Sequence, residues 1–194
     1  PEYWWPNYGT FEVVIGAILT QNTQWKRVEI SLNNLRKVSL NSLQSLANAS
    51  LNEVMQMIKP CGFYQRKGDS LILLSQKILS EYETFEKFVQ TVDREWLLRQ
   101  KGIGNETADS ILCYACMRPI MVVDSYTFQL VNSLSFEFES YEELQEWMIE
   151  SIQEKFSENQ LPYVYAKYHG MIVEYVKKYK KGKIIDVSVL RNIE

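Results

Sequence analysis

The sequence has few of the side chains that bind metals or form disulfides. Its 194 residues include three cysteines, Cys61, Cys113 and Cys116, and a single histidine, His169. Three cysteines fit a reducing compartment better than a disulfide framework. Cys113 and Cys116 form a CxxC pair inside the apolar run ILCYACM, whereas a zinc site needs about four ligands. The sequence therefore predicts neither a metal site nor a cofactor, and we interpret the pair as small buried residues of one helix face.

Long apolar runs are also missing. No stretch is long enough to cross a bilayer, and the first residues do not resemble a secretory leader. Because the chain begins at Pro1 without a methionine, we expect the natural N-terminus to lie upstream. The hydrophobic content of 46% and the charged content of 23% are those of a folded protein with room for one domain or two small lobes.

The chain has no excess of positive charge. A net charge of −3 and a pI near 5.4 argue against a general nucleic-acid coat protein, although a local basic patch can still bind DNA. The densest basic run is VKKYKKGK, residues 176–183. It is equally compatible with contact to nucleic acid and with a solvated helix end, where cations favour the C-terminus.

Helical periodicity dominates the chain, and strand-like alternation is scarce. The short segments MVVD and SFEFES read as turns or extended connectors, and we find no internal repeat. The sequence predicts an all-α protein, with helical segments at residues 11–21, 28–38, 43–58, 70–82, 84–92, 106–117, 141–156 and 163–179.

A glycine turn interrupts the helices at KGIGNETAD, residues 101–109. A helix, a turn of the form glycine–hydrophobic–glycine and a second helix make a helix-hairpin-helix pattern. The glycines permit backbone angles and close approach that a β-carbon forbids, and the helix that follows presents N–H groups to an anion. A DNA phosphate is then held without reading sequence. We expect DNA contacts from Lys101, Gly102, Ile103, Gly104 and Thr107, although such a turn also serves as a plain connection.

Two further motifs accompany the turn. VVDSYTF, residues 122–128, follows the turn, and IGAILTQNTQW, residues 15–25, precedes it. Together they resemble the helix-hairpin-helix DNA glycosylases of the endonuclease III superfamily. In that family a glutamine, matched here by Gln21, enters the gap left by a flipped base, and we expect the adjacent Asn22 to contact DNA as well. The segments WWP, LTQNTQW, GFYQRK, REWLL and KGIG are most similar to the 3-methyladenine DNA glycosylase III branch.

The resemblance implies two helical lobes with a cleft between them. Residues 15–123 are expected to form the central lobe with the hairpin, and residues 1–14 and 124–194 the second lobe. It also implies double-stranded DNA with damaged bases as the partner. We expect a monomer located in the cytoplasm with the nucleoid.

The chain departs from the family at three places. Bifunctional members carry a lysine nucleophile two residues after the second glycine, where this chain has Glu106. Without that amine we expect no strand cleavage. The four cysteines that hold an iron–sulfur cluster in many members are absent. Met171 stands where some relatives have a lysine after a His-Gly pair.

Asp124 matches the catalytic aspartate of the family. Glycosidases normally use two carboxyl groups, one of which protonates the leaving group. A single carboxylate is sufficient when the base is already cationic, as 3-methyladenine is. Asp124 would stabilise the positive sugar and orient or deprotonate the water. The alternative is that Asp124 is a helix N-cap, and both roles are compatible.

The flipped base needs an aromatic pocket, because a cationic purine is held by stacking and cation–π attraction. The resemblance places Trp4, Trp5, Pro6 and Trp25 at this pocket, although each tryptophan also fits a core position. We assign Trp96 and Trp147 to packing, and we interpret His169 as structural.

The sequence thus predicts a monofunctional DNA glycosylase of base excision repair that hydrolyses the glycosidic bond of alkylated purines such as 3-methyladenine. Two alternatives stay open. One is a glycosylase for mismatched or oxidised bases, and the other is a non-catalytic module that grips DNA through the hairpin alone.

Overall fold

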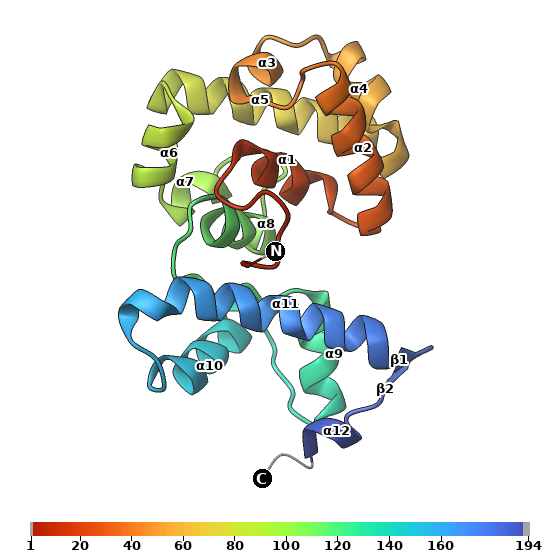
Figure 1. Ribbon diagram of the computed structural model, residues 1–194, viewed down its shortest axis with the longest axis vertical. Helices are drawn as coiled ribbons and strands as arrows, with labels where there is room; N and C mark the ends of the chain where they lie inside the picture. Colours follow the sequence, from red (N-terminus) through yellow and green to blue (C-terminus); the bar gives the residue numbers. More distant parts are fainter. Residues whose placement is uncertain (1, 192–194) are drawn as a thin grey trace. The chain divides into compact units, whose positions relative to one another are not determined.

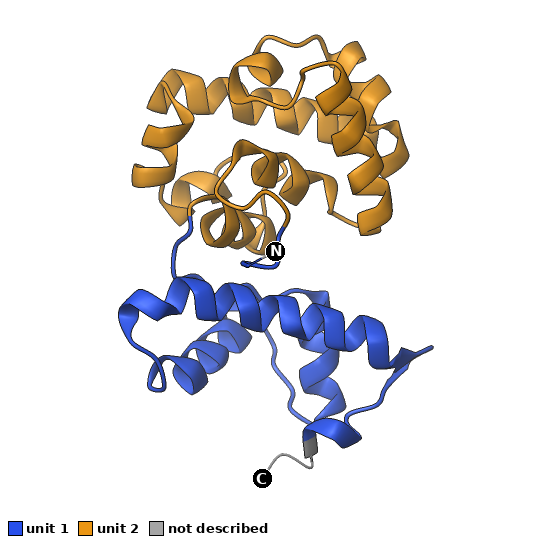
Figure 2. Cartoon of the chain, in the orientation of Figure 1, with its two compact units in different colours: residues 1–5, 117–194 blue, residues 6–116 orange. Residues whose placement is uncertain are grey.

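The computed structural model describes residues 2–191, which fold into two compact units (Figures 1 and 2). We call residues 6–116 the central unit, and residues 1–5 together with 117–194 the terminal unit. Each unit is helical, which confirms the all-α prediction. Among the described residues no helix has the length and apolar composition to span a membrane.

The central unit is built on α1 (Phe11–Leu19). All seven residues of this helix from Val13 to Leu19 are buried, so that α1 is surrounded by neighbouring helices. It packs against α2, α5 and α8. The helices of this unit after α1 are α2 (Trp25–Lys37), α3 (Leu43–Ala47), α4 (Leu51–Ile58), α5 (Tyr64–Tyr82), α6 (Phe85–Thr91), α7 (Arg94–Leu98) and α8 (Asn105–Ser110).

Local capping sets the helix boundaries in this unit. The predicted helix over residues 43–58 is two helices, because Ser50 forms a capping box with Glu53 and starts α4 anew. A 3₁₀ turn, η1 (Lys59–Cys61), then leads into α5. After α8 the chain widens into a π-helical segment, η2 (Ile111–Ala115), where the amide of Cys116 donates to the carbonyl of Ile111.

The terminal unit consists of α9 (Ser125–Ser133), α10 (Tyr141–Gln153), a 3₁₀ turn η3 (Glu158–Gln160), α11 (Leu161–Tyr179) and α12 (Ser188–Arg191). Its core joins α10 to the first half of α11 through Leu144, Met148, Ile152, Val164 and Tyr165. Burying such side chains stabilises a domain by roughly 1.5–3 kcal/mol each, which holds α10 on α11.

A two-stranded hairpin, β1 (Lys180–Lys181) and β2 (Ile184–Ile185), follows α11. The sequence analysis did not predict it, since two-residue strands carry no alternation that could be recognised. MVVD and SFEFES contain no strand, in agreement with their interpretation as connectors.

The boundaries of the two units differ from those of the expected lobes. The central lobe was expected over residues 15–123, and the second lobe over residues 1–14 and 124–194, whereas the central unit covers residues 6–116. The first boundary lies after Trp5, because α1 is buried in the central unit and the amide of Gly9 donates to the carbonyl of Tyr114. The second boundary lies after Cys116, because Met121 and Val123 belong to the core of the terminal unit.

Candidate active site and nucleic-acid interface

The glycine turn joins α7 to α8 as a helix-hairpin-helix motif. Gly102 has a φ of +83°, and a β-carbon there would lie 2.8 Å from Oγ of Ser70, so this position requires glycine. Gly104 has ordinary extended angles and precedes α8, and a β-carbon there would meet nothing within 4 Å. Ile103, which was expected to contact DNA, is 7% exposed, so its side chain packs inside the unit and a DNA contact from this residue is left to its backbone. The turn therefore leaves open space in front of its second glycine.

A buried ion pair fixes the two helices of this motif. Arg94 on α7 donates from Nε to Oδ1 of Asp109 at 2.7 Å and from a guanidinium nitrogen to Oδ2 at 3.2 Å. Asp109 on α8 is fully buried, and a bidentate pair of this kind adds geometric specificity. The hairpin between α7 and α8 is thus held by its supporting helices.

Gln21 meets the hairpin directly. Its Nε2 donates to the carbonyl of Gly102 at 2.8 Å and to Oγ1 of Thr107 at 3.0 Å. The structure therefore brings Gln21 from one predicted motif into contact with Gly102 and Thr107 from another, about 80 residues later in the chain. Asn22 follows with a φ of +51° and an exposed side chain, and Lys101 is exposed as well.

These residues border a depression of about 150 Å³ on the central unit. It is lined by Gln21, Asn22, Phe63, Arg66, Lys67, Ser70 and Gly102. Phe63 was missed as a site residue by the sequence analysis. Its side chain is 67% exposed and its φ is +44°, an unusual combination for a large apolar residue. The signal in the sequence was a phenylalanine directly after KPCG, outside any helical pattern.

Lys67 is the most buried of the residues that line this depression. It is only 4% exposed, and its Nζ donates to the carbonyl of Leu19 at 2.9 Å, to Oγ1 of Thr23 at 2.6 Å and to the carbonyl of Cys61 at 3.3 Å. Burial lowers the pKa of Lys67. One ammonium group thereby ties the loop after α1, which carries Gln21, to the loop before α5, which carries Phe63.

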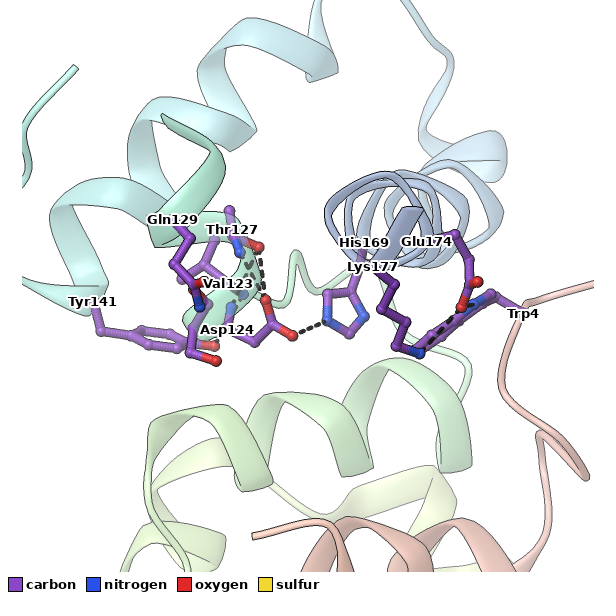
Figure 3. A network of polar contacts seen from close by, with 10 residues as sticks. Trp4, Val123, Asp124, Thr127, Gln129, Tyr141, His169, Glu174 and Lys177 are labelled. Carbon is purple, nitrogen blue, oxygen red and sulfur yellow. Dashed lines mark hydrogen bonds and ion pairs between the residues drawn. The ribbon is translucent and has the colours of Figure 1, made fainter. Parts of the chain in front are cut away.

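Asp124 begins α9 in the terminal unit (Figure 3). Its Oδ1 accepts a hydrogen bond from the amide of Thr127 at 2.9 Å and another from its hydroxyl at 3.1 Å, which completes a capping box. The alternative role as a helix N-cap is therefore present. The cap occupies only one carboxylate oxygen, so that Oδ2 is left for other interactions.

The segment before Asp124 is held rigidly. Met121, Val122 and Val123 are fully buried. From α10, Gln145 Nε2 donates to the carbonyl of Met121 at 2.6 Å, and the hydroxyl of Tyr141 accepts from the amide of Val123 at 3.4 Å. This explains why the apolar sequence MVVD is extended without being a strand: its side chains fill the core while α10 satisfies its backbone.

His169 faces the free oxygen of Asp124. Its Nε2 lies 3.4 Å from Oδ2 of Asp124, and the imidazole is buried in α11 (Figure 3). Burial raises the pKa of Asp124, but the neighbouring His169 and the hydrogen bonds from Thr127 outweigh it, so that the pKa lies below its ordinary value. The sequence analysis interpreted His169 as structural because no partner pattern surrounds it. Its place against Asp124 makes it part of the candidate site.

Trp4 covers the other side of the histidine. The two rings meet edge to face with centroids 5.3 Å apart, and Trp4 Nε1 donates to Oε1 of Glu174 at 3.3 Å. Lys177 Nζ lies 5.8 Å from the centre of the indole (Figure 3). The close approach depends on Gly170, where a β-carbon would lie 2.3 Å from Cγ of Trp4.

The other predicted pocket residues have different surroundings. Trp5 is 6% exposed and packs edge to face on Trp4, whereas Pro6 is exposed. Trp25 is the first residue of α2 in the central unit, and it is half-buried. The structure therefore brings Trp4 and Trp5 together with Asp124 in the terminal unit, and it describes Pro6 and Trp25 within the central unit alone.

Trp96 and Trp147 are packing residues, as predicted. Trp96 is buried against Tyr82 and Phe88, with its indole nitrogen bonded to Glu81 at 2.6 Å. Trp147 packs against the core of the terminal unit. Glu106, which stands at the position of the lysine nucleophile in bifunctional relatives, is exposed in the first turn of α8.

Comparison with known proteins agrees with this geometry. Residues 15–154 match the family model of the HhH-GPD superfamily base excision DNA repair protein. The chain is 38% identical to a protein of Methanocaldococcus jannaschii that bears a provisional DNA repair glycosylase name, over 94% of this chain and 83% of that protein. It is 27% identical to endonuclease III of Thermotoga maritima over 65% of this chain and 57% of that protein.

A solved structure of H. pylori 3-methyladenine DNA glycosylase bound to 1,N6-ethenoadenine is similar along most of the chain. It superimposes with a TM-score of 0.88 at 41% sequence identity, covering 93% of this chain and 91% of that chain. The likeness extends through both units.

Proposed function

This chain belongs to the HhH-GPD superfamily of base excision DNA repair proteins, and we propose that it is a monofunctional DNA glycosylase that removes alkylated purines such as 3-methyladenine. Glycosylase activity follows from the family. The choice of base and the absence of strand cleavage are the proposed part, and they rest on the residues around Asp124 and at Glu106.

The observation that carries the proposal is the pairing of one carboxylate with one histidine. Asp124 is buried, its lowered pKa keeps it ionised, and its Oδ2 faces His169. Within the described residues no group of three or more histidine, cysteine or acidic side chains is arranged to hold a metal ion. A lone carboxylate suits a leaving group that needs no proton, because the alkylated base already carries positive charge.

The reaction then requires little of the protein. The bond between C1′ of the sugar and the ring nitrogen of the base breaks, and its electron pair leaves with the cationic base, which becomes neutral. The ionised Asp124 stabilises the positive charge that develops on the sugar. A water oxygen bonds to C1′, and its proton passes to Asp124 or to solvent. In this scheme His169 is a positioning residue that orients the carboxylate and keeps it ionised.

The aromatic side chains support the choice of substrate. A damaged base must leave the duplex before the bond can be reached, and a cationic purine is attracted to ring faces. Trp4 stands beside His169 in the same unit as Asp124. The H. pylori relative is a 3-methyladenine DNA glycosylase, and its likeness to this chain favours 3-methyladenine as a substrate here.

DNA contacts are proposed for the hairpin and the depression beside it. Lys101, Gly102 and Gly104 would hold a phosphate through backbone N–H groups and charge. Gln21 is bonded to that hairpin, so we propose that Gln21 and Asn22 enter the duplex with it, while the exposed Phe63 contacts the bases from the other edge of the depression.

An excision assay tests the proposal. Purified protein is incubated with duplexes that contain 3-methyladenine, 7-methylguanine or 1,N6-ethenoadenine, and with duplexes that contain an oxidised pyrimidine or a mismatch. We expect release of the cationic bases 3-methyladenine and 7-methylguanine, identified by chromatography, ahead of the neutral 1,N6-ethenoadenine, with the abasic strand left intact. Borohydride should trap no covalent adduct, because Glu106 is not an amine. Preferential release of oxidised or mismatched bases, or efficient trapping, would contradict the proposal.

A further inference from the structure

The terminal unit has a strongly uneven distribution of charge. Residues 119–154 contain eight acidic residues and no lysine or arginine, and five of the eight lie in residues 142–154. Residues 176–183, by contrast, contain five lysines and no acidic residue. A separation of this kind produces a field that attracts a polyanion to one end of the unit and repels it from the other.

The fold keeps these two regions apart. The acidic helix α10 packs on Val164 and Tyr165 in the first half of α11, whereas the lysines lie in its last turn and in the hairpin β1–β2 that follows (Figure 1). Tyr165 lies 12 residues before Lys177, about 18 Å along the axis of α11. This distance exceeds the Debye length of about 8 Å at physiological ionic strength, so the acidic side chains of α10 do little to cancel the charge of the lysines.

The basic hairpin is anchored to the rest of the unit. Ile185 is 5% exposed and packs with Leu130 and Val176. The hydroxyl of Tyr175 donates to the carbonyl of Asp186 at 2.6 Å, and Lys180 bonds to Gln129 on α9. The lysines are therefore presented on an ordered support.

Most of these charges are available to a partner. Lys178, Lys181 and Lys183 are exposed and form no ion pair within the described part of the chain. Lys177 pairs with the exposed Glu174 at 3.2 Å, a surface contact that contributes little to stability. Lys181 and Lys183 in particular are exposed and form neither an ion pair nor a ring contact among the described residues, so their charge is open to a partner.

The basic hairpin also lies close to the candidate site. Lys180 bonds to Gln129, which follows Asp124 by five residues on the same helix, about 7 Å along its axis. Lys177 stands over Trp4, which packs on His169. Lys177 and Lys180 therefore contact residues that flank the carboxylate proposed to act on the sugar.

We propose that residues 178–183 bind the phosphate backbone of DNA beside the damaged nucleotide. This inference rests on the proposed function. The hairpin would supply a second, sequence-independent grip in addition to the glycine turn, on the unit that carries Asp124. Such contacts release counterions, so each phosphate that a lysine neutralises steepens the salt dependence of binding by about 0.9 in log–log slope.

The test compares two double variants of the same charge. Lys181→Gln with Lys183→Gln removes two hairpin lysines, and Lys155→Gln with Lys167→Gln removes two lysines from the other end of the unit. Binding to a duplex with an abasic-site analogue is measured by fluorescence anisotropy between 50 and 300 mM salt. We expect the hairpin variant to bind roughly tenfold more weakly at 0.1 M salt, with a slope smaller by about 1.8. We expect the control variant to keep the slope of the unaltered protein.

Two further measurements separate this inference from the proposed function. Excision under single-turnover conditions with saturating enzyme should proceed equally in the hairpin variant and the unaltered protein. If the unaltered protein excises bases but both double variants keep its salt slope, the hairpin inference is wrong and the proposed function stands. Binding of the unaltered protein to phosphatidylglycerol vesicles that is lost in the hairpin variant, with no change in DNA affinity, would overturn the inference in favour of a lipid surface.

Discussion

Oδ2 of Asp124 lies 3.4 Å from Nε2 of His169, while Oδ1 of the same carboxylate caps α9 through Thr127. The two carboxylate oxygens thus make different interactions. Capping fixes where the carboxylate stands, and the histidine faces the oxygen that is left. A residue with both roles complicates mutagenesis, because most substitutions would remove the cap together with the charge.

Asparagine separates the two roles of Asp124. It caps helices about as well as aspartate but carries no charge, so Asp124→Asn keeps the cap of α9 and should lower the free energy of unfolding only by the contribution of the ionised carboxylate. We expect base excision to fall at least 100-fold, since the developing positive charge loses its partner and the water loses its base. Single-turnover excision and urea unfolding measure the two effects.

Asp93 provides the matched control for this change. It caps α7 by accepting a hydrogen bond from the amide of Trp96 at 2.6 Å, as Asp124 caps α9. Asp93→Asn should therefore leave both stability and excision near normal. If Asp124→Asn also excises at a normal rate, Asp124 is only a helix cap.

Replacement of His169 should change the pH dependence of the reaction. Phenylalanine keeps a ring for Trp4 to pack against but cannot interact with Oδ2. Burial, which raises the pKa of Asp124, then loses its main opposing influence, and the pKa should rise. We expect excision by His169→Phe to fall as the pH is lowered from 7 to 5, whereas the unaltered enzyme keeps its carboxylate ionised throughout this range.

The same shift has a consequence for stability. Because the pKa of Asp124 is lower in the folded state than its ordinary value of about 3.9, the ionised group adds stability above that pH, and this stability is lost as the pH falls through the folded value. In the His169→Phe variant the ionised Asp124 should add less to the free energy of unfolding above pH 4 than it does in the unaltered protein. His169→Gln, whose side-chain amide is able to donate to Oδ2, should restore part of the pH profile. A profile identical in all three proteins would remove His169 from the mechanism.

Gly170 allows Trp4 to lie against α11, and a double-mutant cycle can show this. Gly170→Ala should destabilise the unaltered protein, because the new β-carbon would overlap Cγ of Trp4. In a Trp4→Gly background, which also removes the Cβ of Trp4 that would lie 2.7 Å from the new β-carbon, the same change should instead stabilise by up to about 1 kcal/mol, since alanine is the better helix former. Urea unfolding of the four proteins gives the coupling. Equal effects in both backgrounds would mean that Trp4 does not pack on Gly170 in solution.

The sequence was informative wherever a signal lay within a few residues. Helical spacing located most of the helices, and the turn around Gly102 was recognised from its two glycines. Helical spacing did not reveal every helix boundary. Ser50 caps α4 inside the apolar pattern of residues 43–58, so that the one expected helix is divided into α3 and α4. The difference arises because caps are decided by single hydrogen bonds, which periodicity does not register.

The candidate site was only partly predictable, because its contacts join distant segments. Asp124 and Gln21 were found from motifs, but His169 acquires meaning only when α11 packs beside α9. Lys67 was hidden in the same way: lysines are almost never fully buried, and nothing local indicates that its ammonium meets the carbonyls of Leu19 and Cys61. Such residues are assigned by tertiary geometry alone.

The role of Trp25 separates a base pocket from a core. If its ring faces the flipped base, Trp25→Ala should lower excision about tenfold or more, because stacking of a base on an aromatic ring contributes roughly 1–3 kcal/mol. The half-buried position of Trp25 at the start of α2 limits the loss of packing, so we expect a small change in melting temperature. A cationic base should be affected more than a neutral one.

Trp96 is the control for this substitution, because it is a tryptophan whose surroundings are those of a core. It is 6% exposed and meets the rings of Tyr82 and Phe88 edge to face. Trp96→Ala should therefore cost about 3–5 kcal/mol of stability and lower the melting temperature, while the protein that remains folded excises at a normal rate. Excision is measured well below both melting temperatures and normalised to the folded fraction. If Trp25→Ala melts the protein and leaves excision normal, Trp25 belongs to the core and the base is held by other rings.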